Sequence, residues 1–104
     1  MSFSLTDLEA IVRERAAASP EESWTARLVA SGLPRIAAKT GEEAAETVVA
    51  ALSESDEALA GEAADLLYHL LVLLHARGVA LADVMAVLEA RQGRSGLAEK
   101  AARS

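Results

Sequence analysis

The sequence contains no cysteine, which excludes disulfides, zinc–thiolate centres, iron–sulfur clusters and thiol catalysis together. Aromatic residues are nearly absent as well, with one Phe, one Trp and one Tyr. The interior must therefore be assembled from Leu, Val, Ile and Ala, although hydrophobic residues make up 52% of the chain. This composition favours helices packed against helices.

Positive charge is in the minority. The chain has 10 Lys and Arg against 16 Asp and Glu, a net charge of −6, which argues against nonspecific nucleic-acid binding. The longest apolar stretch, Leu66 to Leu74, is interrupted by Tyr68 and His69 and is far shorter than the about 20 residues that span a bilayer. The first ten residues do not resemble a targeting peptide. We therefore expect a soluble cytoplasmic protein without a membrane partner.

Capping residues and helix breakers divide the sequence into predicted helices. Two pairs of residues have the spacing of a capping box: Ser4 with Asp7, and Ser53 with Asp56. Gly32 is expected to end the second helix as a left-handed residue, and the fourth helix is expected to end at Gly78. Together these signals predict five helices, over about residues 5–17, 24–31, 34–52, 56–77 and 81–92, followed by a short basic tail.

The second half of the fourth predicted helix, Leu66 to Leu74, is apolar on every side. Such a helix has to be buried on every side, and a chain of 104 residues can hardly surround it. We therefore expect a single domain over residues 1–104 with an all-α fold, a helical bundle whose four-helix core is completed by homodimerisation.

Four acidic residues form two pairs of identical spacing, Glu43 with Glu46 and Glu62 with Asp65. A separation of three residues places both carboxylates of a pair on one helical face. The pairs are also mirror-placed about Glu54, so a turn there brings all four carboxylates to the same height. Converging carboxylates repel one another unless a cation lies between them, and oxygen ligands of this kind suit Mg²⁺.

Solvated surface charge is the alternative interpretation of these acids, since Glu42, Glu43 and Glu46 can balance Arg35 and Lys39 along a helix. Lys39 and Arg35 are also suitably spaced to bind phosphate oxygens. Core packing is the simpler role for His69 and Tyr68. For Trp24, a core anchor and a base-stacking residue both remain open.

The segment Lys39-Thr-Gly-Glu42-Glu43-Ala-Ala-Glu46, followed by Glu62-Ala-Ala-Asp65, resembles the EExxE…ExxD signature of the MazG-type all-α nucleotide pyrophosphohydrolases. The resemblance is closest to the phosphoribosyl-ATP pyrophosphohydrolase family and covers nearly the whole chain. Its further elements are Ser23-Trp24-Thr25, Asp65-Leu-Leu-Tyr68-His69 and the tail from Ser95-Gly96 to Glu99-Lys100.

This resemblance implies Mg²⁺-dependent hydrolysis of phosphoribosyl-ATP to phosphoribosyl-AMP and pyrophosphate, the second step of histidine biosynthesis. The implied metal ligands are Glu43, Glu46, Glu62 and Asp65. Glu46 is the first candidate for orienting the attacking water and Glu42 the second. Lys39, Arg35 and, from the neighbouring copy of a dimer, Lys100 are the candidates for binding substrate phosphates.

Three other functions fit the pattern. The nearest is a housekeeping pyrophosphohydrolase that clears noncanonical nucleoside triphosphates with the same acids. The second is a helical dimerisation module with an acidic surface, which would bind no metal and would have no enzymatic activity. A di-iron carboxylate bundle ranks last, because such sites use Glu-x-x-His pairs and here Glu46 and Asp65 occupy the partner positions.

Overall fold

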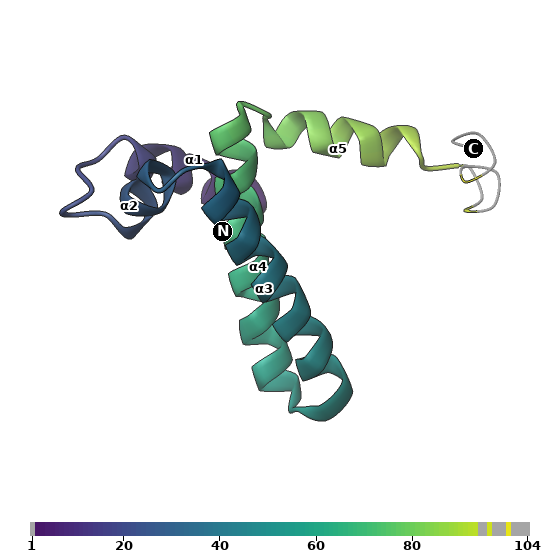
Figure 1. The fold of residues 1–104 in the computed structure, drawn as a ribbon. Coiled ribbons are helices and arrows are strands. Elements are labelled where there is room, and N and C mark those ends of the chain that lie inside the picture. Colours follow the sequence, from purple (N-terminus) through teal and green to yellow (C-terminus); the bar gives the residue numbers. More distant parts are fainter. Residues whose placement is uncertain (1, 94–95, 97–99, 101–104) are drawn as a thin grey trace.

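The computed structural model describes residues 2–93 together with Gly96 and Lys100, and these residues form an all-α fold, as the sequence predicts. Its helices are α1 (Leu5–Ala16), α2 (Trp24–Ala30), α3 (Leu33–Ser53), α4 (Asp56–Arg77) and α5 (Leu81–Ala90). Figure 1 shows α3 and α4 side by side as a long hairpin, with α1 and α2 at one end and α5 leaving that end as an arm. The predicted tail beyond α5 lies outside the described residues except for Gly96 and Lys100.

The first two helices begin at the residues that the sequence predicts. Ser4 and Asp7 form a complete capping box: the Asp7 amide donates to Ser4 Oγ at 3.2 Å, and the Ser4 amide donates to Asp7 Oδ2 at 2.9 Å. Ser23 caps α2 by accepting from the Ala26 amide at 3.1 Å. Local capping thus satisfies amides that would otherwise lack a partner at these helix ends.

The prediction that Ser53 caps the fourth helix is wrong. Ser53 is the last residue of α3, and its hydroxyl donates to the Val49 carbonyl at 2.9 Å. The cap of α4 is Ser55, which accepts from the Ala58 amide at 3.1 Å. The reason is the tightness of the hairpin: two residues, Glu54 and Ser55, suffice to reverse the chain, so α3 continues to Ser53.

The two glycines differ in conformation. Gly78 is left-handed, with φ 73° and ψ 26°, and ends α4 as predicted. Gly32 was expected to be left-handed but has φ 98° and ψ 157°, and it is the N-cap residue of α3, whereas Ser31 is the C-cap of α2. Only two residues, Ser31 and Gly32, separate α2 from α3, so the chain has to turn sharply, and glycine tolerates the positive φ that this turn requires.

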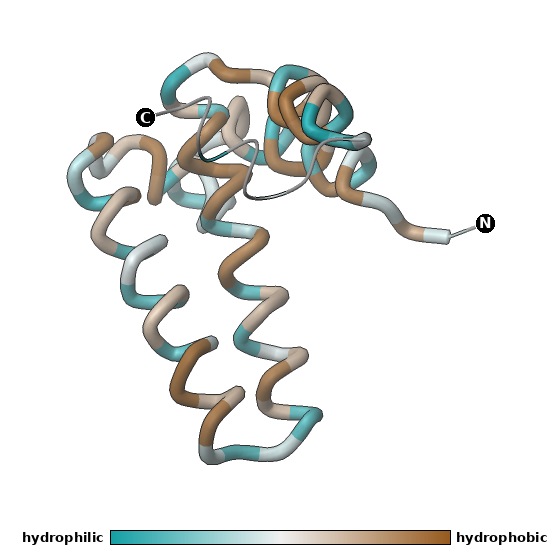
Figure 2. The backbone as a smooth tube through the Cα atoms, turned by 90° about the vertical axis from the view of Figure 1, so that its right-hand side faces the viewer, coloured by the Kyte–Doolittle hydropathy of each residue, from teal (hydrophilic) through white to brown (hydrophobic). Residues whose placement is uncertain are grey.

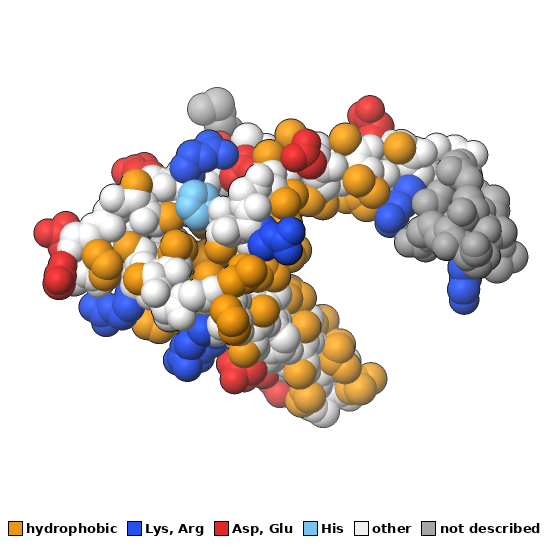
Figure 3. Space-filling model, turned by 45° about the horizontal axis from the view of Figure 1, so that its top comes forward, with side chains coloured by type: hydrophobic (Ala, Val, Ile, Leu, Met, Phe, Trp, Pro, Cys, Tyr) orange, Lys and Arg blue, Asp and Glu red, His pale blue; other side chains and the backbone are white. Residues whose placement is uncertain are grey.

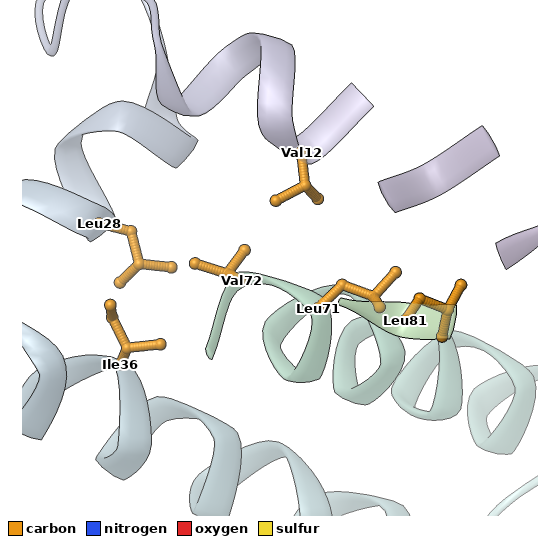
Figure 4. Packing of buried hydrophobic residues seen from close by; sticks show 6 residues of the cluster. All are labelled: Val12, Leu28, Ile36, Leu71, Val72 and Leu81. Carbon is orange, nitrogen blue, oxygen red and sulfur yellow. The ribbon is translucent and has the colours of Figure 1, made fainter. Parts of the chain in front are cut away.

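The hydrophobic core lies at one end of the hairpin, where α1 and α2 pack on the second half of α4 and the start of α3 (Figure 4). Its buried members come from all five helices: Val12, Leu28, Ile36, Leu71, Val72 and Leu81. Leu81 is the buried residue of α5, so the arm is anchored at its first turn. A hydrogen bond to α1 also holds the first residue of α5: the Leu81 amide donates to Glu9 Oε2 at 2.7 Å.

The rest of the hairpin carries apolar surface that this chain does not cover. As the sequence predicts, a single chain does not surround the segment Leu66 to Leu74, since Leu67 and Leu70 are exposed. Leu52, near the tip, is 82% exposed. Hydrophobic colouring continues toward the tip in Figure 2, and hydrophobic side chains gather along hairpin and arm in Figure 3. The radius of gyration, 15.8 Å, accordingly exceeds the about 13 Å of a compact 100-residue domain.

Length and composition alone would allow α4 to cross a membrane, but the core helix of a globular protein passes the same test. In this fold α4 packs against α1, α2 and α3 and contributes His69, Leu71 and Val72 to the buried interior. It also carries Glu62 and Asp65 near its middle, where a bilayer would penalise a charge most. These features make α4 the central helix of the fold.

Ile36→Ala tests the position of the core. Ile36 is fully buried, and we expect its truncation to lower the free energy of unfolding by about 2–5 kcal/mol, measured by urea denaturation. Phe3→Ala, which removes an exposed side chain ahead of α1, should change it by less than about 0.5 kcal/mol. Equal effects of the two substitutions would contradict the core described above.

Candidate metal centre

The hairpin brings together acidic residues from both of its helices. Glu43 on α3 and Glu62 and Asp65 on α4 each offer a carboxylate oxygen, and these oxygens all lie within 4.8 Å of one another. The antiparallel register predicts this meeting, because positions at equal distances from the turn lie opposite each other. We call Glu43, Glu46, Glu62 and Asp65 the acidic cluster.

Glu46, the fourth member, lies beside the other three on the exposed side of α3. Its carboxylate raises the pKa of both Glu62 and Glu43 through hydrogen bonding and through its negative charge. Glu46 and Glu62 also line a hollow of about 400 Å³ toward the hairpin tip, together with Ala45, Val49 and Glu54. Glu46 therefore borders both the cluster and an open space next to it.

The electrostatics of the cluster show the cost of this crowding. Hydrogen bonding to Glu46 is the largest of the causes that raise the pKa of Glu62 to about 7, and loss of hydration and the charges of Glu46, Glu43 and Asp65 add to it. The pKa of Glu43 is raised as well, chiefly by burial and then by the charges of Glu46 and Asp65. Without a cation, the cluster therefore favours a proton on one of its carboxyl groups.

Glu43 provides a second sign that the cluster suits a cation. Its Oε2 atom is buried and has no hydrogen-bond partner among the described residues. A buried carboxylate oxygen without a partner is costly, and a metal ion removes that cost by coordination. The donor set consists of carboxylates alone, which fits a hard divalent cation such as Mg²⁺ better than a soft or nitrogen-preferring metal.

The backbone around the cluster is held by side chains that reach across it. His69 is buried and contacts the Asp65 carbonyl through Nδ1 at 2.7 Å, and its ring meets that of Tyr68 edge-on. Thr40 on α3 donates to the Ile36 carbonyl at 2.9 Å and lies 3.4 Å from the His69 carbonyl on α4. These contacts agree with the core roles expected for His69 and Tyr68 and fix α3 against α4 next to the acids.

The basic residues predicted to bind phosphate do not lie together, unlike the acidic residues. Lys39 lies one turn before Glu43, and its Nζ is 3.7 Å from Glu42 Oε2 on the exposed side of α3. Arg35 lies a further turn away, at a separate hollow beside Trp24 and Arg27. Lys100 is exposed beyond α5. Glu42 thus pairs with Lys39 and is not one of the three acids whose oxygens converge.

Two further residues near the site, Glu54 and Thr25, are not predicted from the sequence. Glu54 lines the hollow beside Glu46 and Glu62, and its position eight residues from each is the signal that pointed to it, since the turn of the mirror register lies there. Thr25 forms a hydrogen bond with Tyr68 at 2.6 Å, linking α2 to α4 over 43 positions. No spacing rule within one helix indicates a pair that only the tertiary fold brings together.

The raised pKa of Glu62 predicts a pH dependence of stability. Between its ordinary pKa of 4.5 and about 7, the folded protein keeps a proton that the unfolded chain releases. The neutral group therefore favours folding at low pH, and this contribution is lost as pH rises through about 7. In a metal chelator, the wild type should lose more thermal stability from about pH 5 to about pH 8 than Glu62→Gln does.

Glu57→Gln, at an exposed acid in the first turn of α4, is the matched control and should keep the pH dependence of the wild type. An identical pH dependence for wild type and Glu62→Gln would contradict the electrostatics of the cluster.

Comparisons with known proteins agree with the resemblance noted in the sequence. Residues 5–92 match the family described as phosphoribosyl-ATP pyrophosphohydrolase. A protein of Agrobacterium fabrum named phosphoribosyl-ATP pyrophosphatase is 62% identical over 98% of this chain and 95% of its own length. Proteins of the same name from Erythrobacter litoralis and Methylobacterium nodulans are 59% and 58% identical, over 96% and 98% of this chain and 96% and 95% of their own lengths. The chain therefore belongs to the phosphoribosyl-ATP pyrophosphohydrolase family.

Proposed function

We propose that this chain hydrolyses phosphoribosyl-ATP to phosphoribosyl-AMP and pyrophosphate, the second step of histidine biosynthesis, as a single-domain cytoplasmic enzyme. The names of its relatives and its family support this substrate. The observation that carries the proposal is the acidic cluster, with Glu43, Glu62 and Asp65 oxygens within 4.8 Å of one another and a buried Glu43 oxygen that has no hydrogen-bond partner in the described part of the chain.

The acidic cluster would hold Mg²⁺ through Glu43, Glu46, Glu62 and Asp65. When bound, the cation supplies charge neutralisation for the phosphate oxygens and for the leaving pyrophosphate. The carboxylates give the site its selectivity for a hard cation and give it a net negative charge without one. The raised pKa values of Glu62 and Glu43 mean that cation binding has to displace a proton, so binding tightens as pH rises.

Glu46 is the residue that we assign to the attacking water. It is exposed, it borders the hollow next to the cluster, and it is one turn from Glu43 on the same face of α3. A carboxylate there can accept the proton of a water that attacks from the open side. Glu42 is second, because it pairs with Lys39 and its oxygens are not among those that converge in the cluster. When substrate binds, Lys39 exchanges this weak, exposed ion pair for a phosphate.

Positioning and charge neutralisation would supply most of the rate enhancement, as in other reactions at phosphorus. Lys39 is close enough to the cluster to take part from the same chain. Arg35 lies two turns from Glu43, about 12 Å along α3, so it serves a phosphate only at the far end of the substrate. Lys100 belongs to this site only when a second copy presents it.

A homodimer is part of this proposal. The hairpin exposes Val48, Val49 and Leu52 on α3 and Leu67 and Leu70 on α4, and the arm exposes Met85, Val87 and Leu88. Two separate apolar surfaces in one extended chain are covered most simply by a second copy of that chain. The buried faces would then complete the four-helix core around the cluster and exclude water from it.

Glu46→Gln tests the mechanism. Gln keeps the size of the side chain but cannot accept the proton of the attacking water, so turnover should fall about 100- to 10,000-fold while the protein stays folded. Pyrophosphate release from phosphoribosyl-ATP is the measurement, and Glu57→Gln, on α4 outside the cluster, should retain wild-type activity. Near-normal turnover by Glu46→Gln would remove this residue from the mechanism.

Metal removal and a substrate panel test the proposed function itself. Excess chelator should abolish pyrophosphate release, and Mg²⁺ should restore it. Free nucleoside triphosphates, canonical and noncanonical, should be hydrolysed far more slowly than phosphoribosyl-ATP. Full activity in chelator would reject metal dependence, and a preference for noncanonical triphosphates would favour the housekeeping function.

Leu52→Glu tests the dimer. A charge at this exposed apolar position would have to be buried in two copies of the interface, so the dissociation constant should rise at least about a hundredfold. Sedimentation equilibrium measures the constant, and Phe3→Glu, at an exposed aromatic residue ahead of α1, is the matched control. A wild-type chain that is monomeric at all concentrations would contradict the dimer.

A further inference from the structure

A cavity of about 550 Å³ lies where the end of α1, the start of α2 and the middle of α4 meet. Its walls carry two aromatic side chains, hydroxyl groups and one charge of each sign: Trp24, Tyr68, Ser23, Thr25, Arg15 and Glu22. Its volume is within the about 300–1,000 Å³ of small-molecule sites. None of these residues belongs to the acidic cluster, so the cavity is a separate feature of the molecule.

The polar wall of the cavity is held in place before any ligand arrives. Thr25 is 3% exposed, and its hydroxyl lies 2.6 Å from the Tyr68 hydroxyl, so the two groups share a hydrogen bond between α2 and α4. Ser23 is buried as well and donates to the Arg15 carbonyl at 2.8 Å. A preformed wall lowers the entropic cost of binding a ligand against it.

Trp24 differs from its two neighbours in exposure. Ser23 and Thr25 on either side are buried, whereas Trp24 is 54% exposed at the rim of the cavity. The only tryptophan of the chain therefore presents an indole surface to solvent instead of filling the core. An exposed indole beside fixed hydroxyl groups suits a heteroaromatic ring, which stacks with its face and hydrogen-bonds with its edge.

The cavity adjoins the acidic cluster along α4. Tyr68 follows Asp65 by three residues, a rise of about 4.5 Å along the helix axis. The ring of Tyr68 also contacts His69 with centroids 5.0 Å apart, and His69 Nδ1 is 2.7 Å from the Asp65 carbonyl. A ligand with phosphates at one end and a ring at the other thus meets the carboxylates and the cavity within one turn of α4.

We propose that this cavity binds the nucleobase of the substrate, with Trp24 stacked on the ring and the hydroxyl groups of Thr25 and Tyr68 at its polar edge. The inference rests on the proposed function and adds a place for the base to it. The acidic cluster, with its cation, then binds the phosphates of the substrate, and the cavity selects the nucleotide by its base.

The fluorescence of Trp24 allows a test that does not depend on turnover. Phosphoribosyl-AMP titrated into the wild-type protein should quench the fluorescence of this single tryptophan with saturation. Pyrophosphate, which has no ring, should leave the fluorescence unchanged. Trp24→Ala should raise KM for phosphoribosyl-ATP by about 5- to 150-fold with a smaller effect on kcat.

Tyr68→Phe is the second variant, because it removes the hydroxyl partner of Thr25 and keeps the ring. It should raise KM while circular dichroism shows an intact fold, and Phe3→Ala should change neither KM nor kcat. A wild-type enzyme that hydrolyses phosphoribosyl-ATP but shows no quenching by phosphoribosyl-AMP, or an unchanged KM in Trp24→Ala, would overturn the inference. Absence of pyrophosphate release from the wild type would instead contradict the proposed function.

Discussion

Mutual repulsion of carboxylates at the centre of the α3–α4 hairpin is the constraint on which the other features depend. The fold holds Glu43, Glu62 and Asp65 within 4.8 Å of one another, with Glu46 at their side. Negative charges so close are tolerated in two ways, by a proton or by a cation. The raised pKa of Glu62 agrees with the first way, and the buried Glu43 oxygen, which has no hydrogen-bond partner among the described residues, agrees with the second.

This constraint also explains how the stability of the chain is distributed. The hydrophobic core lies at the end of the hairpin away from its tip, where α1 and α2 cover α4. The middle of the hairpin carries the acids, and the tip carries exposed Val48, Val49 and Leu52. Within a single chain, the acidic cluster is therefore held by two helices and a turn of two residues. A second copy that covers the apolar faces would fix the separation of the helices, and with it the distances between the carboxylates.

The sequence predicts much of this arrangement because its signals are local. Caps at Ser4 and Ser23 and the stop at Gly78 are properties of a few adjacent residues, and each is found where it was expected. The register of the acids also follows from the sequence, since a tight turn near Glu54 makes positions on both sides symmetric. The cap at Ser55 is not evident from the sequence because Ser53 is followed by an acid at the third position, Asp56, whereas Ser55 is followed there by Ala58; only the length of α3 shows that Ser55 is the cap.

Features that depend on distant contacts could not be predicted in the same way. The bond between Thr25 and Tyr68 and the contact between Glu9 and the start of α5 join residues 43 and 72 positions apart. The apolar run from Leu66 to Leu74 indicates that one chain cannot cover it, but it does not show that Leu67 and Leu70 are the residues left exposed. The surroundings of Lys39 and Arg35 could not be predicted either, because their spacing places both on one helix but does not determine which side chains they contact.

Anomalous diffraction from crystals grown with Mn²⁺ in place of Mg²⁺ tests the metal centre most directly, because it locates the ion itself. A peak between the side chains of Glu43, Glu62 and Asp65, within coordination distance of Glu46 as well, is the result that the acidic cluster predicts. A well-ordered cluster without a peak, at a metal concentration that supports full activity, would contradict it.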